Sequence, residues 1–309
     1  SNSFDRYLTE GTGFSTSTTY RYTDFNSSDI TINNVPGFNV VNFSGASIGD
    51  TFLGQQFIGG LSNPDINTKP ELADEVIYKL RAILISVNQV GLVKANEEFF
   101  KWLCGEKTMP FGENNRHVPV RLFDFENLSN NSYIVTNQFR IHHRETKIPD
   151  IVLFINGIPV VVGEAKTPIR PSVSWLDGAH EINAVYENTI PQLFVPNILS
   201  FSTEGKQFYY GSIRCPLDFW APWKLEEDSL VYNLGLSEIG NELNDLLKPS
   251  RLLDILQNFS LFSSNKKKQR TKVIPRFQQY EGANKIVERV KEGKIKKGLI
   301  WHFQGSGKS

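Results

Sequence analysis

The chain has 309 residues, enough for two domains, and its 39% hydrophobic and 12% aromatic content is that of ordinary globular cores. Its 33 basic and 33 acidic residues cancel, which excludes a global field that steers the protein toward nucleic acid, so any contact with DNA must come from local clusters. Two cysteines exclude a disulfide framework, and neither a membrane-length apolar stretch nor a signal peptide is present, so we expect a cytoplasmic location.

The first part of the chain predicts little regular structure. Residues 1–68 are rich in Ser, Thr, Asn and Gly and show no long helical period, so we expect an irregular N-terminal region of short strands and loops. From residue 69 the apolar positions fit one face of a helix, and a second helix is expected at about 94–103. The positions on that first face are Leu72, Val76, Ile77, Leu80, Ile83 and Leu84.

A strand is expected at 133–143, and two apolar, largely β-branched segments follow at 151–155 and 158–162. Asn156-Gly157 between these two segments predicts an antiparallel hairpin. Asp150 precedes the first strand of this hairpin, and Glu164-Ala165-Lys166 ends the second. The hairpin therefore brings two carboxylates and an ammonium toward one edge of a sheet.

The length of the hairpin loop decides whether these charges meet. A two-residue loop places Asp150 opposite Gly163 and puts Glu164 on the other face of the sheet. A three-residue loop with Gly157 in the left-handed conformation pairs Asp150 with Val162, and Glu164 becomes its diagonal neighbour on the same face. We therefore predict the three-residue loop, with Phe154 paired to Ile158.

Paired carboxylates and a lysine are the residue set of a metal-dependent nuclease. Two carboxylates this close repel each other unless a cation lies between them, and oxygen ligands favour Mg²⁺. A bound Mg²⁺ would activate water and orient a phosphate, Lys166 would position the hydroxide, and Ala165 could add its carbonyl as a ligand. Taken alone, Glu-x-Lys at a strand end is more often a solvated edge. The apolar strands on either side favour the site.

The elements after the hairpin complete the sheet. We expect a helix near 177–188, a strand at 197–202, and helices near 236–247 and 250–259, the latter capped by Ser250. This order predicts a mixed sheet with helices on both faces. The aromatic group Phe219, Trp220 and Trp223 could stack on bases, but packing in a core or between domains is favoured.

Two charged segments follow. The densest basic run lies in 263–273, which we interpret as a linker. Basic linkers are usually only solvated. If this one contacts DNA, the residues that would touch its phosphates are Lys266, Lys267, Lys268 and Arg270.

Residues 299–301 resemble a short buried strand, and 304–309 resemble a phosphate loop. In such a loop the backbone at Gly305 and Gly307 approaches phosphate, Lys308 reaches the terminal phosphates and Ser309 ligates Mg²⁺. Seen alone, this segment could also be a flexible tail.

These motifs together closely resemble the restriction (R) subunit of type I restriction-modification enzymes. The resemblance covers about residues 70–309, and its most specific segments are Ile148-Pro149-Asp150, Gly163-Glu164-Ala165-Lys166, Tyr186, Ile190-Pro191-Gln192-Leu193-Phe194, Arg276-Phe277-Gln278-Gln279-Tyr280 and Trp301-His302-Phe303-Gln304-Gly305-Ser306-Gly307-Lys308-Ser309.

The resemblance implies a PD-(D/E)xK restriction-endonuclease-like core at 69–262, with Asp150, Glu164 and Lys166 catalytic and Asp150, Glu164 and Ala165 binding Mg²⁺. It also implies the start of a RecA-like, helicase-like motor at 274–309, in which Gln279 recognises adenine and ATP binds with Mg²⁺. Tyr186 would contact DNA. One departure is Ile182, with Asn183 beside it, because the family usually carries Gln four residues before this tyrosine.

The resemblance implies Mg²⁺-dependent cleavage of double-stranded DNA, coupled in a longer subunit to ATP-driven translocation and to methyltransferase and specificity subunits. ATP hydrolysis is not expected from this chain alone, because no later motor motif follows the phosphate loop. Two other functions are also compatible with the sequence. One is a catalytically silent DNA-binding or scaffold domain, and the other is a nucleotide-binding module of another helicase-nuclease.

Overall fold

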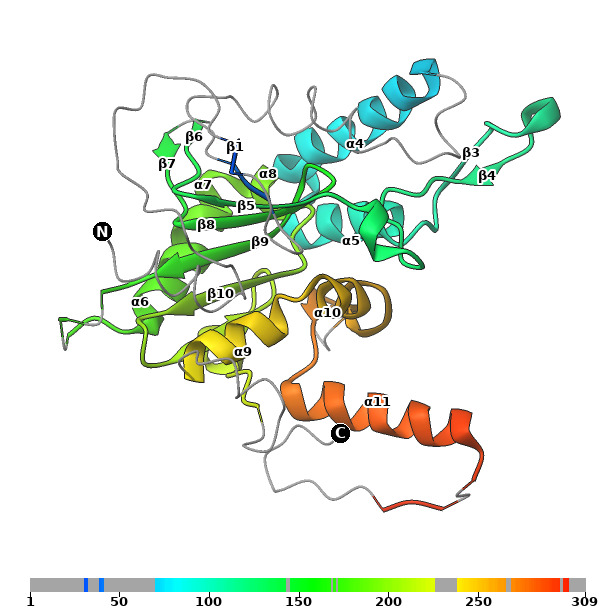
Figure 1. Ribbon diagram of the computed structural model, residues 1–309. Coiled ribbons are helices and arrows are strands. Elements are labelled where there is room, and N and C mark those ends of the chain that lie inside the picture. Colours follow the sequence, from blue (N-terminus) through cyan, green and yellow to red (C-terminus); the bar gives the residue numbers. More distant parts are fainter. Residues whose placement is uncertain are drawn as a thin grey trace.

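The computed structural model describes residues 31–32, 39–41, 70–142, 145–167, 169–170, 172–225, 238–264, 268–294 and 297–299. Its centre is a mixed sheet in the strand order β1-β2-β5-β8-β9-β10-β11 (Figure 1). Within it, β9 runs parallel to β10 and β2 parallel to β5, and the other neighbours are antiparallel. The strands are β1 (Thr31–Ile32), β2 (Asn39–Val41), β5 (Tyr133–Asn137), β8 (Ile151–Ile155), β9 (Ile158–Ala165), β10 (Leu199–Thr203) and β11 (Phe208–Gly211).

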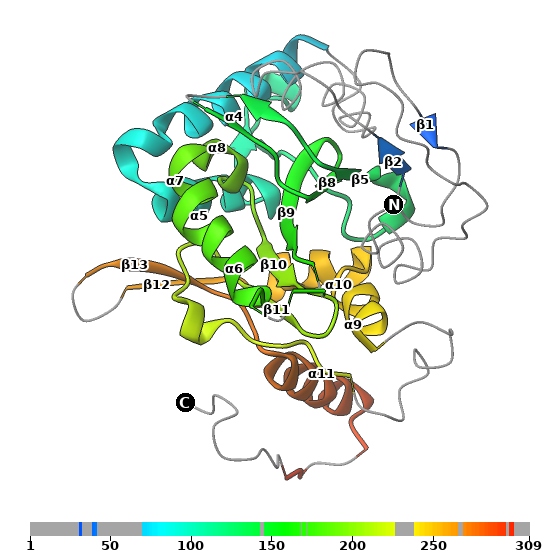
Figure 2. The same ribbon diagram turned by 90° about the vertical axis from the view of Figure 1, so that its left-hand side faces the viewer.

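Helices cover both faces of this sheet, as predicted. Figure 2 shows α5 to α8 on one side and α9 and α10 on the other. The helices are α4 (Pro70–Val90), α5 (Leu92–Leu103), α6 (Trp175–His180), α7 (Glu187–Thr189), α8 (Pro191–Phe194), α9 (Glu238–Leu246), α10 (Pro249–Asp254) and α11 (Phe277–Glu292), with π-helical turns η3 (Glu181–Tyr186) and η6 (Ile255–Phe259). Short 3₁₀ turns are η1 (Glu113–Asn115), η2 (Leu128–Asn130) and η4 (Leu217–Phe219).

In the part of the chain that the structure describes, three two-stranded hairpins lie outside the main sheet. They pair β3 (Thr108–Met109) with β4 (Val118–Pro119), β6 (Ile141–His142) with β7 (Thr146–Lys147), and β12 (Leu261–Ser264) with β13 (Arg270–Val273). The strand predicted at 133–143 is therefore interrupted, because Gln138 has a positive φ of 50° and the chain leaves the sheet there. Among the described residues, no helix has the length and apolarity needed to cross a membrane.

The hydrophobic core is centred on β8 and β9. Every residue of β8 is buried, as is every residue of β9 up to Glu164, which explains why both segments are apolar on both faces. The predicted helical face on α4 is confirmed where its side chains are described: Val76, Ile77, Leu80 and Leu84 are buried and Ile83 is half-buried.

The loop between β8 and β9 contains two residues, and the predicted three-residue loop is wrong. Asn156 and Gly157 both have positive φ, 51° and 76°, as a type I′ turn requires, and Ile155 pairs with Ile158. The Asn156 side chain also accepts a hydrogen bond from the Ser132 backbone and donates to the Leu122 carbonyl. These tertiary contacts fix the short turn.

The extra residue lies within β9 instead of the loop. Phe154 pairs with Pro159 but Leu153 pairs with Val161, so the ladder shifts by one residue at a β-bulge. A shift of one residue exchanges the two faces of a strand. The bulge therefore places Glu164 on the same face of the sheet as Asp150, which is the effect predicted for a three-residue loop.

Beyond the bulge, Ile151 pairs with Gly163. When this register is continued by one residue, Asp150 lies opposite Glu164. The predicted pairing of Asp150 with Val162 is therefore wrong. The expectation that both carboxylates share one face of the sheet holds, although the pairing that produces it is different.

Within the segment 263–273, predicted to be a linker, the described residues belong to the β12–β13 hairpin, whose strand β13 packs against α5. Arg270 forms a two-contact ion pair with Glu97 on α5. Lys272 is 4% exposed and donates to the carbonyls of Asn197 (2.6 Å) and Ile198 (2.8 Å). Burial lowers the pKa of Lys272 well below its ordinary value. These long-range contacts hold the hairpin against α5 and against the segment that precedes β10.

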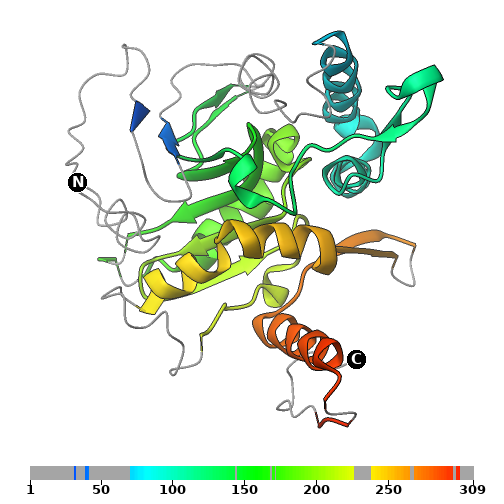
Figure 3. The same ribbon diagram turned by 45° about the vertical axis from the view of Figure 1, so that its right-hand side comes forward.

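The end of the described chain is joined to the core by an aromatic cluster. The Trp223 ring lies 5.1 Å from the Phe277 ring and 5.6 Å from the Tyr280 ring, both on α11. Figure 3 shows α9 and α10 crossing in front of the sheet with α11 beneath them. Trp223 and Trp220 are buried, which confirms their predicted packing role, whereas Phe219 is 63% exposed.

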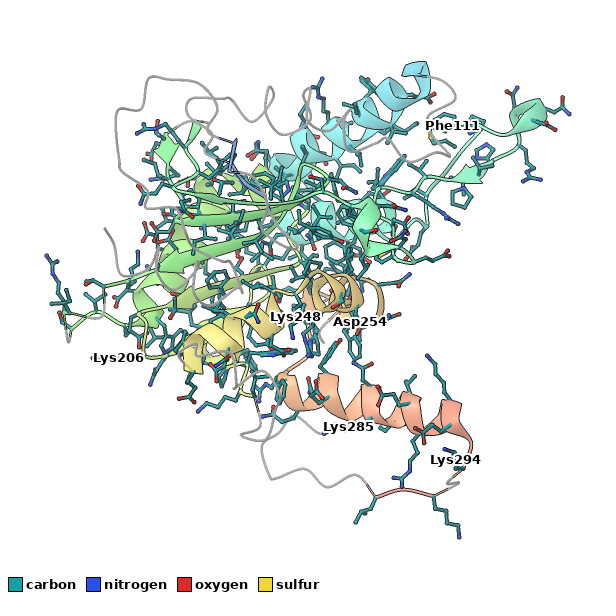
Figure 4. The ribbon with its side chains drawn as sticks, in the orientation of Figure 1. Phe111, Lys206, Lys248, Asp254, Lys285 and Lys294 are labelled. Atoms are coloured by element: carbon teal, nitrogen blue, oxygen red, sulfur yellow. The ribbon has the colours of Figure 1, made fainter. Side chains whose placement is uncertain are left out.

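Two contacts of α10 reinforce this junction. Tyr280 on α11 donates to Asp254 at 2.5 Å, and Arg251 lies 4.8 Å from the centre of the Tyr280 ring. Figure 4 labels Asp254 at the end of α10 and Lys248 just before its start, between the sheet and α11. Lys248, and not Ser250 as predicted, is the N-cap residue, because α10 already begins at Pro249, a residue well suited to the first helical position.

Asn96 links α5 to the segment between α8 and β10. Its amide is buried and donates to the carbonyls of Val195 (2.7 Å) and Asn197 (3.1 Å) after α8. We expect Asn96→Ala to lower the free energy of unfolding by about 3 kcal/mol, because buried carbonyls lose their donor. Urea unfolding measures this change. Asn88→Ala, at an exposed position of α4, is the control and should change it by less than about 0.5 kcal/mol.

Candidate active site

The predicted charged residues meet where β8 begins and β9 ends. The Asp150 carboxylate accepts a hydrogen bond from the Ala165 backbone N–H at 3.0 Å, and Glu164 Oε1 accepts one from the Asp150 backbone N–H at 3.2 Å. Lys166 Nζ donates to Glu164 Oε2 at 3.0 Å. Asp150, Glu164 and Lys166 are therefore neighbours in space, as the hairpin predicted.

Glu164 is an unusual carboxyl because it is 2% exposed. Burial, followed by repulsion from Asp150, raises its pKa from 4.5 to about 8. The Lys166 ammonium opposes this rise without cancelling it. A buried acid beside a second acid is the arrangement that a bound cation would relieve.

Lys166 is held between two carboxylates. Its Nζ donates to Glu164 and also to Glu181 at 2.5 Å. Burial alone lowers the pKa of Lys166, but these two carboxylates outweigh burial and raise it. Lys166 therefore remains an ammonium at neutral pH, suited to holding an anion and not to accepting a proton.

Glu181 is the residue that sequence analysis missed. It lies in the π-helical turn η3, and Tyr186 at the other end of that turn donates to its Oε1 at 3.0 Å. The neighbouring residue Ile182, at the position singled out in the sequence, has a side chain that is fully buried in the core. Glu181 alone carries no motif, because nothing local in the sequence predicts that the helix widens at this point.

Tyr186, predicted to contact DNA, has its hydroxyl directed at the charged cluster. Burial and the nearby carboxylates of Glu164 and Glu181 raise its pKa. Its contact with DNA remains a prediction. The same holds for Lys268, which is exposed, and for Arg270, whose guanidinium is engaged by Glu97; Lys266 and Lys267 lie outside the described residues.

Gly163 explains how β9 lies so close to β10 beside this cluster. A Cβ at this position would lie 2.3 Å from the Phe201 ring on β10, too close for any real contact. Phe201 is fully buried, so the ring has no free space to move into. Glycine before Glu164 is therefore required by core packing.

The donors present suit an oxygen-preferring cation. Across the described residues, no group of three or more His, Cys, Asp or Glu side chains forms a metal cluster. The candidate ligands are instead the Asp150 and Glu164 carboxylates and the predicted carbonyl of Ala165. This set fits Mg²⁺, which binds through one or two carboxylates and keeps several waters.

Of the predicted ATP-site residues, the structure describes Gln279 alone. Its side-chain oxygen accepts a hydrogen bond from the Arg276 backbone N–H and caps the start of α11. Gly305, Gly307, Lys308 and Ser309 lie outside the described residues.

Comparisons with known proteins agree with this arrangement. Residues 56–218 match the family described as "Type I restriction enzyme R protein N terminus", and residues 278–309 match the SWI2/SNF2 ATPase family. The first match contains the whole charged cluster. The second begins within α11, so an ATPase-type domain starts there, which implies ATP as its ligand.

Individual relatives show the same likeness. The chain is 30% identical to the type I restriction enzyme HindI endonuclease subunit of Haemophilus influenzae over 83% of this chain and 25% of that protein. It is 33% identical over 62% of its length to a Methanocaldococcus jannaschii protein named "Putative type I restriction enzyme MjaVIIIP endonuclease subunit", covering 18% of that protein. The chain thus spans about a quarter or less of these relatives' length.

The family match over 56–218, which contains the whole Asp150–Glu164–Lys166 cluster, and the ATPase match from 278 onward occur in the order expected of a single subunit. This chain belongs to the type I restriction enzyme R protein family, of which it carries the N-terminal region and the start of the SWI2/SNF2 ATPase.

Proposed function

We propose that this chain is the Mg²⁺-dependent endonuclease part of a type I restriction enzyme and cleaves double-stranded DNA. The observation that carries the proposal is the meeting of Asp150, Glu164 and Lys166 at one edge of the sheet. Glu164 is 2% exposed and lies beside a second carboxylate, and burying a carboxyl group in this way costs free energy. A domain that served only as a scaffold would gain nothing in return for that cost.

The residues divide the chemistry between them. Asp150 and Glu164 would hold Mg²⁺, with the Ala165 carbonyl as a third ligand; when bound, the metal supplies an activated water and neutralises charge on the phosphate. Lys166, kept as an ammonium by its carboxylate partners, orients the attacking hydroxide and stabilises the charge that develops on the phosphate oxygens. The buried apolar strands β8 and β9, which lead into the site, keep bulk water away from its side that faces the core.

The remaining function depends on the longer protein. We propose that the ATPase domain that starts at α11 binds ATP with Mg²⁺ through Gln279 and the phosphate loop, and drives DNA past the nuclease. Methyltransferase and specificity subunits would supply target recognition. The buried contacts between Trp223 and α11 join the nuclease to this motor directly, with no flexible spacer among the described residues.

A cleavage assay on the full-length subunit in its assembled complex tests the proposal. Plasmid carrying unmethylated target sites should be cut with ATP and Mg²⁺. The Asp150→Asn complex should continue to hydrolyse ATP on the same plasmid without cutting it. Undiminished cutting by the Asp150→Asn complex contradicts the proposed site.

Mg²⁺ binding should depend on pH through Glu164. Because its pKa is raised from 4.5 to about 8, the stability that the neutral acid provides is fully present below about pH 4.5 and is lost as the pH rises through about 8. Mg²⁺ requires the ionised form. We therefore expect Mg²⁺ to raise the melting temperature more at about pH 8.5 than at about pH 6.5.

The comparison with and without Mg²⁺ isolates this one group. Burial also raises the pKa values of Glu187 and Glu242, to about 8 and about 7, so stability in the absence of metal reflects several acids. Glu164→Gln should remove most of the Mg²⁺ effect at both pH values. An equal Mg²⁺ effect at both pH values in the unmodified protein would count against Glu164 as a ligand.

A further inference from the structure

Lys166 is held from two sides, and the second side comes from a different element than the hairpin. Glu164 on β9 contacts the ammonium at 3.0 Å, and Glu181 on η3 contacts it at 2.5 Å. If Glu164 engages a metal, as the proposed function requires, its hold on the ammonium weakens. Glu181 then remains the carboxylate that keeps Lys166 in place.

The shape of the helix explains why Glu181 can reach the site. Residues five apart in an α-helix are separated by about 140° around the axis, so Glu181 and Tyr186 would point in different directions. In the π-helical turn η3 they come together, and the Tyr186 hydroxyl donates to Glu181 at 3.0 Å. The turn therefore directs Glu181 at Lys166 and places the Tyr186 hydroxyl against the same carboxylate.

The residues next to Glu181 face elsewhere. Ile182 is fully buried in the core, and the Asn183 amide donates to the Cys215 carbonyl at 2.5 Å. Ile182 thus contributes only packing in this chain. The widened turn presents the preceding residue to the lysine instead.

A glycine one turn earlier sets how closely this helix approaches the site. A Cβ at Gly178 on α6 would lie 2.3 Å from Ser202 Oγ, 3.0 Å from Glu164 Cβ and 3.4 Å from Lys166 Cε. The helix is therefore pressed against β10 and against the end of β9, which carries Glu164 and leads into Lys166. This close approach places the Glu181 carboxylate within hydrogen-bonding distance of the ammonium.

We propose that Glu181 is a positioning residue that holds the Lys166 ammonium in place for cleavage, and that Tyr186 in turn fixes the Glu181 carboxylate. The proposal rests on the nuclease function proposed above. Neither residue needs to touch DNA or metal for this role. Their removal should therefore slow the chemical step and leave substrate binding unchanged.

Single-turnover cleavage by the full-length subunit in its complex tests this role. We expect Glu181→Ala to lower the rate constant about 10- to 100-fold with little change in the DNA concentration that gives half the maximal rate, because a misplaced group of this kind costs about 100-fold. Glu181→Gln retains an oxygen that accepts from the ammonium and should restore most of the rate. Tyr186→Phe should lower it about 3- to 10-fold.

A matched control and a stability measurement exclude a purely structural effect. Asn188→Ala alters an exposed side chain two residues beyond η3, on α7, and should leave the rate unchanged. Melting temperatures of all variants should lie close to that of the unmodified protein, because Glu181 is 38% exposed in its side chain. A Glu181→Ala enzyme with a normal rate, or a Glu181→Gln enzyme as slow as Glu181→Ala, overturns the inference.

The Asp150→Ala complex separates the two possible failures. If Asp150→Ala is inactive while Glu181→Ala cuts normally, the nuclease assignment stands and the positioning role of Glu181 is wrong. If Asp150→Ala cuts normally, the proposed function itself fails.

Discussion

Alanine at Asp150, Glu164 or Lys166 should each lower the rate of DNA cleavage by about 1000-fold or more. The reason is that each residue supplies a different part of one transition state: a metal ligand, a second metal ligand, or an ammonium beside the reacting phosphate. The effects should not add in the double variants, because residues that act as one unit lose nearly everything with the first change. Quenched single-turnover cleavage of plasmid by the assembled complex measures all of these rates.

ATP hydrolysis on the same DNA is the control for these three variants. The ATPase match begins at residue 278, far along the chain from the cluster, so hydrolysis should continue at its normal rate. A loss of cleavage together with a loss of ATP hydrolysis points to misassembly. Normal cleavage by any one of the three variants contradicts the site.

Trp223→Ala should lower the free energy of unfolding by about 4 kcal/mol, the largest effect on stability that we expect from a single side chain here. The indole is fully buried and contacts the rings of Tyr210, Phe277 and Tyr280. Its Nε1 also donates to the buried Asp245 carboxylate at 2.8 Å. Removing it leaves a cavity where the sheet, α9 and α11 meet. Urea unfolding followed by circular dichroism measures the change.

Two further variants separate the contributions to the stability lost in Trp223→Ala. Trp223→Phe keeps much of the ring and loses the N–H, and Asp245 still accepts from Arg251 at 2.9 Å, so a loss of about 1 kcal/mol is expected. Phe219→Ala changes an aromatic residue that is 63% exposed and should cost less than about 0.5 kcal/mol. If Trp223→Ala costs no more than Phe219→Ala, the junction is not the tightly packed one described.

The sequence predicted elements whose stability is local. The helical face of α4 and the apolar strands β8 and β9 follow from short-range periodicity, and both were placed correctly. Asn156-Gly157 also marked the turn at its true position. The cluster of Asp150, Glu164 and Lys166 was predicted because these elements carry it.

Features decided by distant contacts were not predicted. The hairpin register depends on a bulge inside β9, where five apolar residues in a row give no local sign of which one is extra. The β12–β13 hairpin is held by Arg270 and Lys272 through contacts with residues far away in sequence. The π-helical turn that brings Glu181 to Lys166 likewise has no signal in residue type or spacing.

Diffraction from crystals of this chain soaked in Mn²⁺ is the most direct test, because the proposed nuclease function depends on a cation held by the two carboxylates. We expect an anomalous peak bound by an oxygen of Asp150 and an oxygen of Glu164, and no peak at that position in Glu164→Gln crystals. Unmodified crystals with no peak between the two carboxylates, at a Mn²⁺ concentration that saturates exposed acidic sites, would contradict it.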